Sequence, residues 1–352
     1  MTVLDDRAAL RAADPSGMLD IVTGLGAQCH EGYALGLGAR PLPEADGITS
    51  IAFCGMGGSA IAGDVVAALA APRLRFPIAV VRTPRLPEFC GPHTLVVASS
   101  YSGDTLETLG LFEEAVGRGC RMVALTAGGE LARRAEELGI GRVIVPGGYM
   151  PRAAFGLLST SAIGALEAMG IMPPHADEVD EAVAEMTGVI AEAGPDVPSA
   201  TNPAKELALA IGERVPIVWG ADGIGSVAAT RWKSQLNENA KVPSFASALP
   251  ELDHNEVEGW SSGSGAGFAL IALRHPGEDA DVAARFPLSE EIVRASGATV
   301  REVSSRGRSE FARLLTLVQF GDLVSTYLGI ARGVDPSPIE AIASLKRSLA
   351  QA

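Results

Sequence analysis

The segment from Ser100 to Thr105 combines hydroxyl side chains with one glycine, directly after an apolar run and before a helical pattern. Residues 95–98 have the composition of a short buried strand, and leucines recur with a helical period from position 106 onward. A loop that leads from a strand into a helix directs backbone N–H groups and the positive end of the helix dipole toward one point, which favours an anion. The hydroxyls of Ser100, Ser102 and Thr105 can add donors there. The alternative is an ordinary turn in which Ser and Thr only cap the helix.

A second glycine-rich loop, residues 55–60, supplies Gly57, Gly58 and Ser59 after an earlier strand. Its G-x-G-x-x-A spacing matches the dinucleotide fingerprint, but the next strand ends at Arg82 without the carboxylate that binds a ribose. An NAD site is therefore disfavoured, and an NADP site is only slightly better. The glycines could simply allow a close strand-to-helix turn. A third interpretation places both loops at the carboxyl ends of parallel strands, where together they would bind one phosphate and a polyol.

Glu238 is the first candidate for proton transfer, because it lies in the final turn of a helix predicted over residues 226–240. The negative end of the helix dipole and any desolvation would raise the pKa of its carboxyl group toward that of a general base. Arg231, two turns earlier on the same face, would oppose this rise. The alternative is a solvated polar helix end.

His254 is the second candidate for proton transfer. Asp253 and Glu256 have the spacing of a capping box, which would place His254 in the first turn of a helix. The positive helix end there favours a neutral imidazole, which suits acid–base chemistry near neutral pH. Trp260 and the neighbouring aliphatic residues predict partial burial of this segment. A lone histidine at a helix start is otherwise more often only a surface residue.

Arg152 and Lys346 are cationic candidates in two further helices. Arg152 follows Pro151 in a predicted first helical turn, where a cation is unfavourable by about 0.3–1 kcal/mol. We therefore expect a compensating anion, either a structural carboxylate or a substrate oxyanion. Ser337 and Pro338 predict the start of a last helix, with Lys346 on the flank of its apolar stripe. Most lysines in such positions extend to water, so spacing alone does not favour a catalytic Lys346.

The elements that must position these residues alternate between strands and helices. The patterns predict strands at 48–54, 77–82, 94–99, 121–126 and 142–145, with helices at 60–71, 106–118 and 130–138. The alternation resumes at a strand over 216–219, followed by strands at 267–274 and 298–303 and helices at 310–331 and 337–350. This rhythm predicts an α/β fold with parallel, doubly wound sheets. The strand–loop–helix units at Gly55 and Gly220 suggest two similar subdomains.

Composition limits the classes of function. A chain of 352 residues is expected to form roughly two domains. The formal charge of −14 argues against nucleic acid or an anionic membrane surface as the main partner. Four scattered cysteines without C-x-x-C spacing predict neither a zinc site nor a disulfide framework. The N-terminus lacks a signal-peptide pattern and no apolar run approaches about 18 residues, so we expect a cytoplasmic protein.

Six motifs taken together resemble one enzyme family. They are GMGGSA (55–60), SYSGDT (100–105), PRAA (151–154), NENAK (237–241), DHNE (253–256) and DPSPIEAIASLK (335–346). In this order they resemble the bifunctional phosphoglucose/phosphomannose isomerases of the sugar isomerase (SIS) superfamily. The resemblance implies a homodimer without metal or other cofactor. It also implies two flavodoxin-like SIS subdomains with parallel sheets flanked by helices, at 47–150 and 201–333, with a helical segment at 1–46, connecting helices at 151–200 and a C-terminal helix at 334–352 that completes the active site.

The resemblance further implies interconversion of glucose 6-phosphate and mannose 6-phosphate with fructose 6-phosphate through a cis-enediol. Glu238 would be the base and Arg152 the enediolate stabiliser. His254, contributed by the partner subunit, would open the sugar ring with Lys346 nearby. The sugar phosphate would be held by the hydroxyls of Ser59, Ser100, Ser102 and Thr105, and by the backbone of Gly57 and Gly58. The alternative is a phosphosugar-binding SIS protein without turnover, acting as a sensor or assembly factor.

Two positions depart from the pattern of that family. Ala60 stands where the family often has Gly, and Asp104 stands where it commonly has Asn. A carboxylate at Asp104 would place negative charge beside the proposed phosphate, so it must point away, be paired, or weaken binding. We expect Asp104 to have a capping role.

Overall fold

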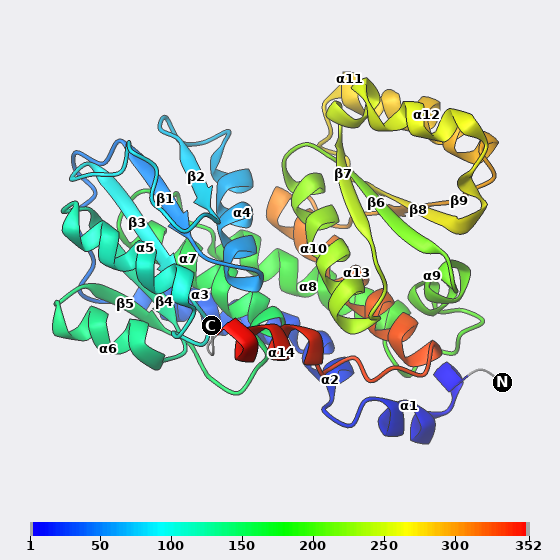
Figure 1. The fold of residues 1–352 in the computed structure, drawn as a ribbon, viewed down its shortest axis with the longest axis horizontal. Helices are drawn as coiled ribbons and strands as arrows, with labels where there is room; N and C mark the ends of the chain where they lie inside the picture. The colour runs from blue at the N-terminus through cyan, green and yellow to red at the C-terminus, as the bar shows by residue number, and fades with distance from the viewer. Residues whose placement is uncertain (1–2, 350–352) are drawn as a thin grey trace. The chain divides into compact units, whose positions relative to one another are not determined.

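The computed structural model describes residues 3–349, which form two compact units with one parallel sheet each (Figure 1). Unit A comprises Gly24–Thr187 and Gly307–Arg313. Unit B comprises the residues up to Thr23, Gly188–Arg306, and the residues from Leu314 onward. The predicted α/β class with two parallel sheets flanked by helices is confirmed.

The five strands of unit A follow the order β2-β1-β3-β4-β5, with every pair parallel. This is the flavodoxin-like order, in which the strand sequence reverses between β1 and β3 and ligands bind at the carboxyl ends. The strands are β1 (Ser50–Cys54), β2 (Ile78–Val81), β3 (Thr94–Ser99), β4 (Arg121–Thr126) and β5 (Gly141–Ile144). The helices are α3 (Leu25–Gly38), α4 (Gly58–Ala70), α5 (Leu106–Gly117), α6 (Gly129–Glu137), η2 (Pro151–Ala154) and α7 (Phe155–Ala168). Helix α8 (Ala176–Ala193) begins in unit A and ends in unit B.

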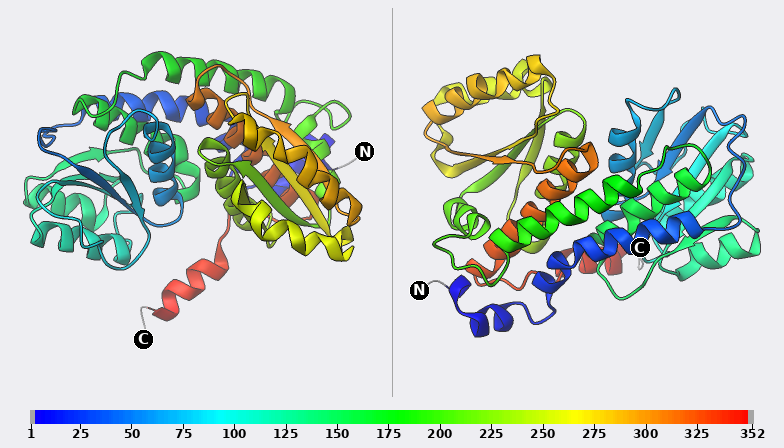
Figure 2. Two further views of the ribbon diagram at one scale, coloured as in Figure 1. Left: turned by 90° about the horizontal axis from the view of Figure 1, so that it is seen from above. Right: turned by 180° about the vertical axis from the view of Figure 1, so that it is seen from behind.

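Both faces of this sheet are covered, as the nearly continuous apolar sequence of its strands requires. Ala52, Val96 and Ala124 belong to one buried cluster with Phe112 of α5 and Leu131 of α6. The alternate side chains of the strands face α4 and α7 on the other side of the sheet. Helix α3 packs on α7 (Figures 1 and 2). Because helices cover both faces, only the strand ends and their loops are available to a ligand.

Helices α3 and α7 pack with their backbones in direct contact. A Cβ added to Gly36 of α3 would lie 2.2 Å from the Ser161 carbonyl oxygen, and one added to Gly164 of α7 would lie 2.5 Å from the Tyr33 carbonyl oxygen. No side chain tolerates such distances, so glycine is required at both positions. The close packing fixes the start of α7 and the turn η2 that precedes it.

Unit B repeats the arrangement around β6, with the parallel order β7-β6-β8-β9. The suggested similarity of the two strand–loop–helix units is confirmed, because β1 and β6 hold equivalent positions and each leads into a helix capped by a glycine of positive φ, Gly57 or Gly223. The strands are β6 (Val215–Ala221), β7 (Phe245–Leu249), β8 (Phe268–Arg274) and β9 (Thr299–Ser304).

One face of the second sheet packs against α12, and the other packs against α10. The predictions missed β7, η5, α11 and α12 here. The helical elements are η1 (Val3–Asp5), α1 (Arg7–Ala13), α2 (Met18–Thr23), α9 (Pro203–Ile211), α10 (Ile224–Asn239), η3 (Glu251–His254), η4 (Glu256–Ser262), η5 (Gly265–Gly267), α11 (Ala280–Ala283), α12 (Arg285–Ala295), α13 (Glu310–Ala331) and α14 (Glu340–Leu349).

Helix α13 is long and apolar enough, by length and composition, to cross a membrane. Its most apolar window is nevertheless 89% buried inside the folded structure. A mostly buried core helix passes the same compositional test, so α13 is weak evidence for a membrane span.

The glycine contacts between α3 and α7 lead to a stability prediction. Gly36→Ala should lower the free energy of unfolding by about 1–3 kcal/mol, because the added methyl group overlaps the α7 backbone. The matched control is Gly38→Ala in the same helix, where nothing lies within 4 Å of the added Cβ. That variant should be neutral, or more stable by up to about 1 kcal/mol, because Ala is the better helix former. Urea unfolding measures both, and equal stabilities would contradict the close packing.

Candidate functional site

The two predicted anion loops lie together at the carboxyl edge of the unit A sheet. Cys54 at the end of β1 pairs in register with Ala98 near the end of β3, so the loops that follow these strands start side by side. The backbone N–H of Tyr101 donates to the Ser59 Oγ at 3.1 Å, which joins the loops directly. The predicted proximity of the two loops is therefore confirmed.

The hydroxyl groups of the second loop form an ordered internal network. Ser100 Oγ donates to Thr105 Oγ1 at 3.0 Å and accepts from the Gly103 N–H at 3.2 Å. Ser102 Oγ accepts from the Asp104 N–H at 3.2 Å. Ser59 and Ser100 are buried, Thr105 is partly exposed and Ser102 is exposed. Because Thr105 and Ser102 accept hydrogen bonds here, their own hydroxyl protons remain to be donated to a ligand.

Tyr101 connects this loop to two further segments, a role that sequence reasoning missed. Its carbonyl oxygen accepts from the Ala127 N–H at 2.9 Å in the loop after β4. Its hydroxyl donates to the Pro146 carbonyl and accepts from the Tyr149 N–H, both at 2.9 Å. Burial raises the pKa of the Tyr101 phenol above its ordinary value, so it stays a neutral donor. The sequence offered one signal for this role, the aromatic Tyr101 between Ser100 and Ser102.

Arg152 is placed beside the first glycine loop by backbone contact. A Cβ on Gly58 would lie 2.9 Å from the Pro151 carbonyl oxygen and 3.1 Å from the Arg152 Cα, so only glycine lets α4 begin there. The Gln28 side-chain amide donates to the Ala153 carbonyl at 2.9 Å and holds the same turn from α3. Arg152 is 3% exposed. It lies in the first turn of a helical element, as predicted, and this element is the 3-10 helix η2, which leads into α7 at Phe155.

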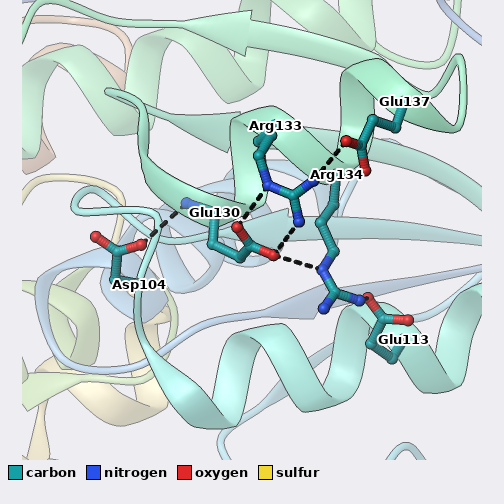
Figure 3. A network of polar contacts seen from close by, with 6 residues as sticks. All are labelled: Asp104, Glu113, Glu130, Arg133, Arg134 and Glu137. Atoms are coloured by element: carbon teal, nitrogen blue, oxygen red, sulfur yellow. Dashed lines mark hydrogen bonds and ion pairs between the residues drawn. The ribbon is translucent and has the colours of Figure 1, made fainter.

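The predicted capping role of Asp104 is confirmed. Its Oδ1 accepts from the Glu130 N–H at 2.9 Å, in the first turn of α6 (Figure 3). The capped helix is α6 and not α5, which Asp104 precedes in sequence. Its negative charge therefore lies against the positive end of a helix.

Glu238 lies in the last turn of α10 in unit B and is partly exposed. Lys241 follows with a positive φ of 56° and donates from its ammonium group to the Glu238 carbonyl and, at 3.0 Å, to the Pro336 carbonyl. Its charge suits the negative end of α10. Lys241 thus holds the turn that carries Glu238, a role that the sequence analysis did not assign.

Arg231 pairs with a carboxylate of α13. Its guanidinium makes two hydrogen bonds to the Asp322 carboxylate, at 2.8 and 3.2 Å, and both side chains are buried. The Asp322 carboxylate compensates the buried positive charge of Arg231. Removal of either partner would leave an uncompensated buried charge, which is costly. The pair ties α10 to α13.

The predicted capping box around His254 is wrong. The Asp253 carboxylate accepts from the Ser289 hydroxyl at 2.7 Å and pairs with Arg285 at 3.2 Å. The Glu256 carboxylate accepts from the Trp219 indole N–H at 2.8 Å and from Ser247. With both carboxylates engaged elsewhere, Asn255 caps η4 instead.

His254 ends the 3-10 helix η3, and its side chain is exposed. The prediction that it lies in a first helical turn with partial burial is therefore wrong. Leu252, two residues earlier, is buried in the core of unit B and anchors the same 3-10 helix.

Lys346 lies in α14, which starts at Glu340 rather than at the predicted Ser337–Pro338 cap. The segment before it is stabilised differently, because the Ser337 N–H donates to Asp335 Oδ1 at 2.9 Å. None of the residues of α14 from Glu340 to Leu349 is buried, and Lys346 is exposed.

Unit A thus holds the two loops and Arg152, and unit B holds Glu238, His254 and Lys346. Two cavities of about 400 and 680 Å³ in unit B include none of these residues in their walls. Within residues 3–349, no cluster of three or more His, Cys, Asp or Glu side chains is arranged to hold a metal ion.

The contacts of Tyr101 lead to a prediction for the loop assembly. Tyr101→Phe should lower the free energy of unfolding by about 0.5–3 kcal/mol, because it removes the hydroxyl that bridges Pro146 and Tyr149. Tyr149→Phe is the control, since its own hydroxyl makes none of the loop contacts described above. Thermal unfolding compares them, and equal stabilities would show that the bridge contributes nothing.

Comparisons with known proteins bear on the fold and the family of this chain. The family model described as the bacterial phospho-glucose isomerase C-terminal SIS domain matches residues 200–349. A solved structure of a glucose-6-phosphate isomerase like protein from Thermus thermophilus superposes with a TM-score of 0.63 and 20% identity, covering 99% of both chains. At that identity it supports the fold alone.

Two curated relatives cover most of the chain. The bifunctional phosphoglucose/phosphomannose isomerase of Caldicellulosiruptor bescii is 33% identical over 336 residues, covering 95% of this chain and 99% of the relative. The enzyme of the same name from Aquifex aeolicus is 34% identical over 301 residues, covering 85% and 90%. With this identity over nearly its whole length, the chain belongs to the bifunctional phosphoglucose/phosphomannose isomerase family.

Proposed function

We propose that this protein is an aldose–ketose isomerase that interconverts glucose 6-phosphate, and also mannose 6-phosphate, with fructose 6-phosphate. The observation that carries the proposal is the joined pair of hydroxyl loops at the carboxyl edge of a flavodoxin-like sheet, with a buried arginine beside them. The names of the curated relatives specify the reaction.

The loops would anchor the sugar phosphate. Ser59, Ser102 and Thr105 accept hydrogen bonds within the loops and so have hydroxyl protons to donate, while Ser100 donates its proton to Thr105 and orders the loop. Helices α4 and α5 both begin at the carboxyl edge of the unit A sheet, so the positive ends of their dipoles face the proposed phosphate position. Because the phosphate is remote from the reacting carbons, its binding energy serves to position the sugar.

The chemistry would be carried by the remaining side chains. Glu238 moves a proton between C2 and C1 through a cis-enediol, and Arg152 stabilises the negative charge that develops on the enediolate oxygen. His254 and Lys346 assist ring opening, and α14 completes the active site. The isomerisation moves protons within one sugar. It therefore needs a base and a group that stabilises the enediolate, and Glu238 and Arg152 would supply them.

Three further features belong to the same proposal. The protein acts as a homodimer, and the exposed imidazole of His254 is available to the active site of the partner subunit. It works in the cytoplasm, within glycolysis and gluconeogenesis. A phosphosugar-binding protein without turnover is disfavoured, because Glu238, Arg152 and His254 exceed what the binding of a phosphate requires.

Replacing the proposed base tests the reaction. Glu238→Gln should lower turnover by at least about 100-fold, the lower end of the range for general base catalysis, while leaving the fold intact. The assay follows glucose 6-phosphate formed from fructose 6-phosphate by coupling it to glucose-6-phosphate dehydrogenase. Mannose 6-phosphate is tested in parallel by NMR detection of fructose 6-phosphate.

The control is Glu213→Gln, which alters a carboxylate that is 84% exposed and pairs with Arg332 in the same unit. It should retain turnover within about twofold, as expected for an exposed ion pair. Near-normal turnover in a folded Glu238→Gln variant would overturn the assigned base. A wild-type protein that binds the sugar phosphates without converting them would support the binding-only alternative.

A further inference from the structure

The proposed phosphate loop interlocks with the loop between β4 and α6. A Cβ on Gly103 would lie 1.9 Å from the Gly128 carbonyl oxygen, and one on Gly129 would lie 2.4 Å from the Ser102 carbonyl oxygen. Both glycines also have positive φ, at 77° and 67°. The Leu131 N–H donates to the Gly103 carbonyl at 3.0 Å. The position of the phosphate loop therefore depends on where α6 begins.

Asp104 is the side chain that connects these two loops. Its Oδ1 accepts from the Glu130 N–H at 2.9 Å, and a Cβ on Gly129 would come within 2.8 Å of the same oxygen (Figure 3). Its backbone N–H donates to the Ser102 Oγ, which orients that hydroxyl as a donor. One residue thus caps α6 and orders a predicted phosphate ligand.

The side chain of Glu130 belongs to a separate ion-pair network that crosses from α6 to α5. It bonds to Arg133 and Arg134, and Arg134 also pairs with Glu113 of α5 (Figure 3). Hydrogen bonds from Arg133 and then Arg134 lower the pKa of Glu130 to about 2. These side chains are between 32% and 51% exposed, so solvent screens their attraction. The backbone N–H of Glu130, rather than its carboxylate, makes the contact with the phosphate loop.

We propose that Asp104 is a positioning residue, whose carboxylate fixes the phosphate loop by capping α6. The inference rests on the proposed function, because it assigns a residue to the phosphate end of the same site. The cap also directs the negative charge of Asp104 toward the positive end of α6, where it is stabilised. Asp104 therefore contributes to binding of the phosphate group and has no part in proton transfer.

The test separates binding from turnover. Asp104→Ala should raise the KM for fructose 6-phosphate and the Kd of inorganic phosphate in parallel, each by about 10-fold, with kcat within about threefold of wild type. Asp104→Asn keeps an oxygen that accepts the Glu130 N–H, so it should hold both constants within about twofold. Calorimetric titration with inorganic phosphate gives the Kd without any need for turnover.

Glu130→Gln is the matched control, because it disrupts the ion-pair network but keeps the backbone N–H that Asp104 accepts. It should leave KM and Kd within about twofold of wild type. If Asp104→Ala does not fold, Asp104→Glu replaces it, since the longer side chain displaces the capping oxygen and should also raise both constants.

Several results would overturn the inference. The first is an unchanged KM and Kd in Asp104→Ala, or in Asp104→Glu where that variant replaces it, and the second is a loss confined to kcat. The third is an Asp104→Asn variant that is as impaired as Asp104→Ala. The fourth is a Glu130→Gln variant whose KM and Kd rise as much as those of Asp104→Ala. If the wild-type protein shows no isomerisation, the proposed function fails, yet the phosphate Kd values of the same variants still decide the role of Asp104.

Discussion

The hydrogen bond from the Tyr101 N–H to the Ser59 hydroxyl is the interaction on which the proposed phosphate site depends. It exists because β1 and β3 are parallel neighbours in register, so the chain leaves both strands at the same edge. Parallel pairing at the point where strand order reverses creates this crevice in open α/β sheets. The remaining contacts of Tyr101, to the loop after β4 and to the segment before η2, extend the same assembly toward Arg152.

An acidic protein that binds a phosphate ester needs local compensation for its charge. The formal charge of −14 opposes an anion at long range. At the two loops, helix ends, hydroxyl donors and a buried arginine would supply the local attraction in the proposed site. The carboxylate nearest in sequence, Asp104, is directed at the first turn of α6. Glycines at positions 58, 103 and 129 allow these backbone approaches, because a side chain at any of them would collide with neighbouring main chain.

The sequence was sufficient for most strands of the two sheets and for the two loops, because each has a local signal. It predicted a capping role for Asp104 but not the helix that is capped, α6. Buried parallel strands give apolar runs, and β3, β4 and α13 follow the predicted bounds. It failed at β7, a short strand of small residues whose Phe245 is 57% exposed and which gives little apolar signal. It also failed at His254, where Asp253 and Glu256 have capping spacing but bind Ser289 and Trp219 instead. Those partners are distant in sequence, so no local pattern could reveal them.

The central claim is that turnover proceeds by proton transfer through an enediol. It is tested most directly by running the wild-type reaction from fructose 6-phosphate in deuterium oxide and examining C2 of the glucose 6-phosphate by proton NMR. Because a carboxylate base exchanges its proton with solvent between steps, the account predicts deuterium at C2 as the mixture approaches equilibrium. Glucose 6-phosphate that forms without solvent deuterium at C2, even after many turnovers, would contradict it.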